Sequence, residues 1–274
     1  MPGETTLFQT KLKQAAQMII QLAHHVTGVP VTVVCDSWFG NDGLFKPLRK
    51  HLGASFHLLS RLRSNTVLYS MAPTKPTKRK RGRSRKYGSR LGTCAEVAAM
   101  TKTKASSHRV FLYGHYRDVL ASTKVAMLKT LKCPVRVVWV FRKTQWIALF
   151  STDLDLSTAQ IIEYYGARWK IESGFKEIKQ DIGSSKSQTR NAHAVINHIN
   201  FSMMAVTVTW IYGARLENIP ERRHKVRGRN SFAFSDLRHI IAKVGLSEDF
   251  DAVCRNHPKS LKKSFINTLL RMVA

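Results

Sequence analysis

The sequence predicts an α/β fold in which helices alternate with buried strands. Residues 7–26 carry apolar side chains at helical spacing, which predicts an amphipathic helix. Residues 31–35 form a short, unbroken and mostly β-branched run, typical of a strand that is buried on both faces of a sheet. Leucines at every fourth position of 44–52 predict a second helix, and 54–59 predicts the next strand. Helix, strand, helix, strand is the order of an α/β core.

The net charge indicates a polyanionic partner. The chain has 45 Lys and Arg against 17 Asp and Glu, which gives +28 and a pI near 10.5. Nucleic acid is the first candidate. An anionic membrane is disfavoured, because the basic residues do not lie on one amphipathic helix. The four cysteines form no CxxC pair, which favours reduced thiols of a cytoplasmic protein over zinc ligands or disulfides.

A basic run of low complexity interrupts the core at residues 75–90. It is rich in Lys and Arg and has no acidic residue, so it cannot bury enough apolar surface to order itself, and we expect disorder in the free protein. Its Arg81-Gly82-Arg83 resembles the arm of an AT-hook, which lies in the minor groove. Arg81, Arg83 and Arg85 are therefore candidate DNA-binding residues, although a merely solvated linker is an open alternative.

The middle of the chain predicts strands. Residues 108–116, 135–142 and 145–151 are rich in aromatic and β-branched side chains. The last two of these ranges predict a hairpin that leads directly into a helix at 157–183. Ser157 followed by Gln160 is the pattern of a capping box, and Gly183 is placed just beyond the helix end. A further long helix is predicted at 191–216.

The helix at 157–183 carries one stripe of polar groups. At about 100° per residue, four side chains fall within roughly 60° of each other. They are Tyr165, Arg168, Glu172 and Lys179. The alternative is a solvated face with i, i+4 pairs. Gly166 and Gly174 weaken this alternative, because each costs roughly 1 kcal/mol relative to Ala and is better explained by the close approach of a backbone or a nucleic acid.

The spacing of this stripe resembles a known signature. Tyr, two residues, Arg, three residues, Glu, six residues, Lys is similar to the Tyr-Arg-Glu-Lys (YREK) signature of bacterial insertion-sequence DDE transposases that are IS-four-like. The resemblance implies that Glu172 binds metal and that Tyr165, Arg168 and Lys179 contact DNA. It also implies a ribonuclease H-like core, Mg²⁺ or Mn²⁺ as cofactor, double-stranded DNA (element ends and target) as partner, a homodimer on DNA and a cytoplasmic, nucleoid-associated location.

Metal-dependent phosphoryl transfer requires converging carboxylates. Asp36 follows the strand at 31–35, at the kind of strand end where open α/β sheets bind ligands. Asp36 and Glu172 are the best pair, and we predict both as catalytic residues and metal ligands. Asp153 and Asp155 precede the signature helix; the family resemblance treats this pair as structural, and a metal contact by Asp153 stays open.

The resemblance also predicts how the chain is organised. The family's first catalytic Asp lies on a strand that precedes the helix at 7–26, so we expect this Asp and roughly three strands to be absent, as in a transposase truncated at its N-terminus. The expected segments are a partial ribonuclease H-like core (1–62), a basic flexible segment (63–107), a β-rich insertion (108–152), the catalytic helix with the next core helix (153–216) and a helical C-terminal extension (217–274). The expected function is metal-dependent DNA strand cleavage and strand transfer at insertion-sequence ends. Without the first Asp, this chain alone is expected to bind metal weakly and to cleave DNA slowly or not at all. A non-catalytic DNA-binding remnant or regulator is the alternative.

Overall fold

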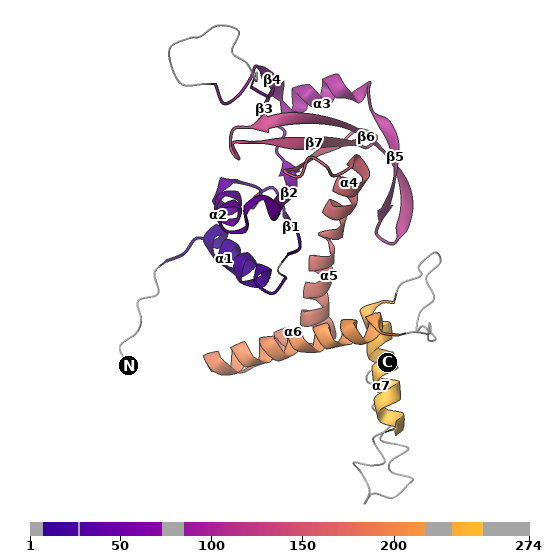
Figure 1. Ribbon diagram of the computed structural model, residues 1–274. Helices are drawn as coiled ribbons and strands as arrows, with labels where there is room; N and C mark the ends of the chain where they lie inside the picture. Colours follow the sequence, from indigo (N-terminus) through magenta and orange to yellow (C-terminus); the bar gives the residue numbers. More distant parts are fainter. Residues whose placement is uncertain (1–7, 27, 73–84, 217–231, 249–274) are drawn as a thin grey trace, which may run out of the picture. The chain divides into compact units, whose positions relative to one another are not determined.

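The strands of the chain belong to one sheet in the computed structural model, which describes residues 8–26, 28–72, 85–216 and 232–248 (Figure 1). Within these residues the strand order is β1-β2-β8-β7-β6-β3-β4, and β5 pairs only with β6. The pair β1 and β2 is parallel, and the other pairs are antiparallel. The strands are β1 (Val31–Val34), β2 (Phe56–Leu62), β3 (Val67–Tyr69), β4 (Arg90–Thr93), β5 (Ser106–Leu112), β6 (His115–Leu128), β7 (Cys133–Phe141) and β8 (Trp146–Ser151).

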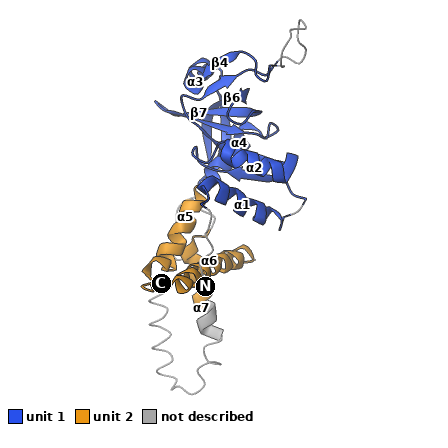
Figure 2. Ribbon diagram, turned by 90° about the vertical axis from the view of Figure 1, so that its left-hand side faces the viewer, with its two compact units in different colours: residues 1–168 blue, residues 169–274 orange. Residues whose placement is uncertain are grey.

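The chain divides into two units, residues 1–168 (unit 1) and 169–274 (unit 2), which Figure 2 shows in blue and orange. Unit 1 contains the sheet with α1 (Lys11–Ala23), α2 (Asp42–Leu52), α3 (Cys94–Lys102) and α4 (Thr158–Ala167). Unit 2 contains α5 (Lys170–Lys176), α6 (Ala192–Ala214) and α7 (Phe234–Glu248). The sequence therefore predicted the α/β class correctly, together with α2, β1, β2, β7, β8 and α6.

Both faces of the sheet are covered in unit 1. One buried cluster joins α1, α2 and α3 to one face, and Trp139 and Phe150 are its large central side chains. A second cluster joins α4 to the opposite face through Ile161 and Ile162. Successive residues of β7 belong to different clusters, for example Val137 to the first and Val138 to the second. This arrangement explains why the central strands are nearly continuous apolar runs.

The prediction that β1 is buried on both faces was wrong. All four of its residues are only partly buried. The reason is its place in the strand order, because β1 stands at one end of the described sheet and pairs only with β2. The strands at 108–152, predicted as an insertion, continue this same sheet, since β8 pairs directly with β2.

The strand predicted at 108–116 is a hairpin. Tyr113 and Gly114 have φ angles of 55° and 85°, so the chain turns there from β5 into β6. The sequence analysis missed β6 as a separate strand. Its 14 residues include the exposed polar stretch 115–118, which hid the apolar pattern of its second half.

The single helix predicted at 157–183 is also interrupted. α4 begins at the predicted capping box and ends at Ala167, and α5 follows after a turn at Arg168 and Trp169. A π-helical turn, η2 (Glu177–Asp181), then precedes Gly183, whose φ of 84° confirms it as the residue beyond the helix end. Since a π turn has a longer period than an α-helix, the assumption of one regular stripe through Lys179 does not hold.

The rest of the predicted organisation falls partly outside the described residues. Of the basic run 75–90, residues 75–84 lie outside them, and the remainder leads into β4, which begins at Arg90. Most of the predicted C-terminal extension also lies outside, while α7 begins at Phe234.

The two helical glycines serve different purposes, which allows a matched test. A Cβ on Gly166 would collide with the Leu112 side chain, whereas one on Gly174 meets nothing within 4 Å. Gly166→Ala should therefore destabilise the protein by about 1–3 kcal/mol, as overpacked core sites do. Gly174→Ala should be neutral or stabilising by up to about 1 kcal/mol. Urea unfolding of both variants checks this, and equal effects would contradict the packing role of Gly166.

Candidate active site

Asp36 lies immediately after β1, where its carboxylate fixes the turn that follows. Its Oδ1 accepts hydrogen bonds from the backbone N–H of Trp38 (2.9 Å) and of Phe39 (3.1 Å). Among the described residues, Oδ2 has no hydrogen-bond donor, and the Asp36 side chain is exposed. One oxygen is thus held by the backbone while the other is open to a ligand.

The neighbouring strand holds the backbone of Asp36 in place. The buried Ser60 hydroxyl on β2 donates to the carbonyl oxygen of Asp36 at 2.6 Å. Gly40 closes the turn by donating its N–H to the same carbonyl at 3.1 Å. A Cβ on Gly40 would collide with the Ser60 side chain, so this turn requires glycine. These contacts fix the direction in which the carboxylate leaves the sheet.

The start of α4 is held by several hydrogen bonds. Ser157 and Gln160 form the predicted capping box, which is thereby confirmed. The Arg136 guanidinium on β7 donates two hydrogen bonds, of 2.9 and 2.6 Å, to the carbonyl oxygen of Leu154. The Asp153 carboxylate accepts the N–H of Asp155 at 3.0 Å, which gives Asp153 a structural role in this loop.

Tyr165 and Arg168 stand together at the end of α4. The Arg168 guanidinium carbon lies 5.7 Å from the centre of the Tyr165 ring, a cation–π arrangement. Tyr165 packs against the second buried cluster, and both side chains are only partly exposed. The two signature residues of unit 1 therefore form one preorganised group.

The charge of Arg168 also acts at the end of β1. Burial raises the pKa of the Cys35 thiol to about 11, and the Asp36 charge adds to this. The hydrogen bond with Ser60 and the positive charge of Arg168 act in the opposite direction. The charge of Arg168 is therefore felt at the Cys35 thiol, the residue that precedes Asp36.

Glu172 and Lys179 belong to unit 2. Glu172 is exposed on α5, and the Lys179 ammonium on η2 lies 5.7 Å from the centre of the Phe175 ring. The nearby Glu177 is occupied differently, since its Oε2 accepts the indole N–H of Trp210 on α6 at 2.8 Å. Glu177 thus secures α6.

Only one of the three predicted DNA-binding arginines lies among the residues that the structure describes. Arg81 and Arg83 lie outside the described residues, whereas Arg85 is described and exposed. The sequence analysis missed the cluster at the base of this segment. The Lys129 ammonium lies 4.1 Å from the ring centre of Tyr69 and 5.7 Å from that of Tyr87, so this cluster joins a residue before the basic run to one near the end of the run. A tyrosine before the run and another near its end were the available signal.

The donor chemistry at Asp36 suits a hard cation. Mg²⁺ prefers oxygen ligands and usually keeps several waters, so it is bound through one or two carboxylates together with substrate phosphates. An anchored carboxylate with one open oxygen fits this requirement. Within the described residues, no three His, Cys, Asp or Glu side chains gather around one point. A site that combines Asp36 with Glu172 stays a prediction.

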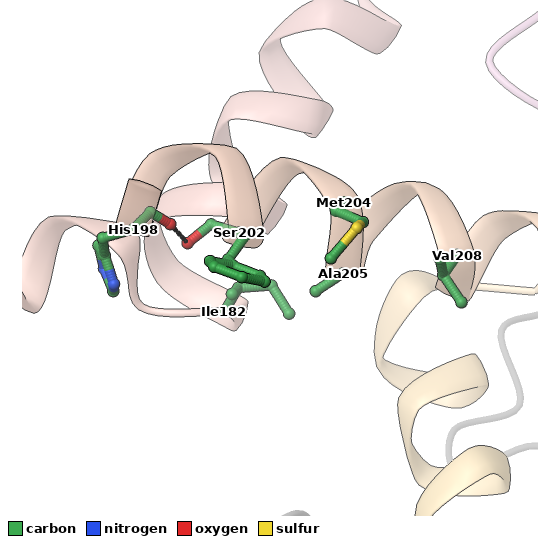
Figure 3. Close-up of a pocket in the computed structure, with 7 residues that line it drawn as sticks. Ile182, His198, Ser202, Met204, Ala205 and Val208 are labelled. Atoms are coloured by element: carbon green, nitrogen blue, oxygen red, sulfur yellow. Dashed lines mark hydrogen bonds between the residues drawn. The ribbon is translucent and has the colours of Figure 1, made fainter. Parts of the chain in front are cut away.

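A hollow of about 510 Å³ lies along α6 in unit 2 (Figure 3). Its lining is mostly apolar, and the Ser202 hydroxyl donates to the carbonyl oxygen of His198 at 2.8 Å instead of facing a ligand. Its lining residues are Ile182, His198, Phe201, Ser202, Met204, Ala205 and Val208. Of the helices described, α6 alone is long and apolar enough to cross a membrane, by length and composition only, and one such helix is weak evidence for a membrane span. The hollow has no carboxylate and is not a site for phosphoryl transfer.

Comparison with known families identifies the class of protein to which this chain belongs. Residues 9–208 match the family described as the transposase DDE domain, and the chain belongs to this family. A search of curated proteins found no match. Membership makes the chain a nucleic-acid-processing protein of DNA transposition, in a family that binds DNA, generally uses a divalent metal and is normally soluble and cytoplasmic.

The position of Arg168 is testable through the Cys35 thiol. Removing the guanidinium in Arg168→Ala takes away a charge that favours the thiolate, so the Cys35 pKa should rise further above about 11. Iodoacetamide labelling of the Cys35 peptide, followed by mass spectrometry at increasing pH, should then need a higher pH than in the wild type. Lys102→Ala on α3 is the matched control and should leave the profile unchanged. A shift in the control alone, or in neither variant, would contradict this placement.

Proposed function

We propose that this chain is the transposase of a bacterial insertion sequence and that it catalyses metal-dependent strand cleavage and strand transfer at the element ends. The observation that carries the proposal is the anchored Asp36 carboxylate after β1, whose second oxygen is open, in the same unit as Arg168 at the end of α4. A carboxylate of this kind suits a metal ion, and a guanidinium suits a DNA phosphate. Membership of the transposase DDE family supports the same reaction class.

Asp36 and Glu172 are the proposed metal ligands. A bound Mg²⁺ or Mn²⁺ would activate the attacking oxygen and stabilise the leaving oxygen of a phosphodiester. Asp36 contributes a carboxylate whose direction is fixed by the backbone of Trp38 and Phe39. Glu172 contributes an exposed carboxylate from α5. The two take the places of the second and third carboxylates of a ribonuclease H-like, IS-four-like site, and the first is not among the acids assigned here.

The basic and aromatic signature residues are proposed to hold the DNA end. Arg168 offers a planar guanidinium that matches a phosphate, and its contact with Tyr165 limits its freedom before binding. Lys179 supplies a point charge from unit 2. Arg81, Arg83 and Arg85 are proposed to track the backbone of the duplex through counterion release, consistent with the net charge of +28. A homodimer on paired ends is part of this proposal.

Carboxylate substitution tests the proposed catalysis. With a supercoiled plasmid that carries the DNA flanking the gene, Asp36→Asn and Glu172→Gln should each reduce Mn²⁺-dependent nicking by at least about a hundredfold, because lost metal stabilisation is worth several kcal/mol. DNA affinity, measured without metal, should stay within about threefold of the wild type, since neither side chain is a cation for phosphate. Asp155→Asn is the matched control, because Asp155 is exposed and precedes the same helix.

The same assay distinguishes the non-catalytic alternative. Nicking by Glu172→Gln at the wild-type rate would contradict the assignment of Glu172. DNA binding by the wild type without any metal-dependent nicking would contradict the enzyme and favour a DNA-binding regulator.

A further inference from the structure

We propose that the exposed face of the β5–β6 hairpin binds unpaired nucleotides of the DNA on which the protein acts, by stacking bases on Tyr113 and Tyr116. This inference rests on the proposed function, because it assigns an additional DNA contact to the same protein. It adds a surface that is separate from the signature residues and from the basic run 75–90.

The pairing register separates the hairpin into two faces. In an antiparallel pair, residues opposite each other share a face, and neighbours along a strand alternate. Val110 lies opposite Arg117, and Leu112 lies opposite His115. Phe111 and Tyr116 lie opposite each other, on the other face. The hairpin therefore has two faces. The first contains Val110 and Leu112, and the second contains Phe111 and Tyr116.

The apolar residues of the first face are used inside the protein, whereas His115 and Arg117 on the same face are exposed. Val110 is fully buried, and Leu112 packs against the same cluster as Ile161 and Ile162 of α4. The hairpin is held to α4 by a second contact, because the Glu163 carboxylate accepts the N–H of Phe111 at 2.7 Å. Gly166 gives Leu112 the space that this packing needs. The hairpin is thus a fixed part of unit 1, attached to the helix that ends in Tyr165 and Arg168.

The second face and the tip expose aromatic rings that this packing does not explain. The exposed fractions are 50% for Phe111, 56% for Tyr113 and 66% for Tyr116. Phe111 and Tyr116 form an edge-to-face pair with ring centres 5.2 Å apart. The hairpin therefore exposes an aromatic pair on its second face and a third ring at its turn.

Each tyrosine already has an arginine beside it. The Arg109 guanidinium lies 5.2 Å from the ring centre of Tyr116, and that of Arg117 lies 5.8 Å from the ring centre of Tyr113. Asp118 lies opposite Arg109 in the register. However, within the described residues Arg109 and Asp118 form no ion pair, so Arg109 is not neutralised by a salt bridge to its cross-strand neighbour. Aromatic rings for bases next to cations for phosphates are the composition of single-strand binding surfaces.

The backbone conformation of the turn also indicates a functional role for Tyr113. Tyr113 adopts a φ of 55°, which a bulky side chain rarely does, while Asn or Gly is usual at this position of a hairpin turn. Strained backbone of this kind tends to be kept where it serves function. Unpaired bases are the favoured occupant, because a ring stacks on a base face and a duplex covers those faces except at its ends.

The test compares two DNA probes by fluorescence anisotropy, using the full chain without metal. One probe is a blunt duplex, and the other is the same duplex with a short single-stranded tail. Tyr116→Ala should lower affinity for the tailed duplex at least about fivefold, since stacking contributes strongly per base. Affinity for the blunt duplex should change less than about twofold, because phosphate contacts dominate there. Tyr116→Phe keeps the ring and should bind both probes as the wild type does.

Tyr113→Asn separates binding from folding. Asn followed by Gly114 favours this turn, so thermal stability should be retained or raised, while tail affinity falls because a ring is lost. Wild-type tail affinity in both Tyr113→Asn and Tyr116→Ala would overturn the proposal. An equal loss on both probes would also overturn it, as would a shift in self-association without a change in tail affinity, which would assign this face to a second copy of the chain. Because no metal is present, the outcome is independent of whether the chain cleaves DNA.

Discussion

The packing of α4 against the sheet is the contact on which the arrangement of unit 1 depends. Ile161 and Ile162 bury themselves against the face that the first helices leave free, and this fixes where α4 ends. Arg168 follows that end directly, and its charge acts on the Cys35 thiol after β1. The hairpin β5–β6 depends on the same contact, because it is held between the sheet and α4. One apolar interface therefore positions a carboxylate, a cation and an exposed hairpin in a single unit.

Elements with a strong local signal were predicted from the sequence. The β-branched run at 31–35, the capping box at Ser157 and Gly183 at the helix end all depend on residues close in sequence, and the structure confirms each of them. The break at Arg168 and Trp169 was not predictable in this way. Both residues have right-handed helical backbone angles, and neither is a proline or a glycine, so nothing local marks the interruption.

The sequence indicated which residues belong to the candidate site, but it gave few of the contacts between them. The spacing of Tyr165 and Arg168 placed them on one side of a helix, and the structure brings them together. The packing of Tyr165 against the second buried cluster depends on tertiary structure, which helical periodicity does not contain. The hairpin was missed for a related reason. The exposed tyrosines and the arginine at 113–117 interrupt the apolar alternation by which a strand is recognised in a sequence. That these residues form a hairpin is visible only from the register of β5 and β6.

The most direct measurement of the central claim is iron-mediated backbone cleavage. Fe²⁺ that occupies the metal site, with ascorbate and peroxide, generates hydroxyl radicals that cut the chain close to its ligands, and mass spectrometry locates the cuts. If Asp36 and Glu172 hold one metal site, cuts should occur next to both residues in the wild-type protein bound to DNA. Asp36→Asn should then abolish both sets of cuts. Cuts next to Glu172 that persist in Asp36→Asn would contradict the account.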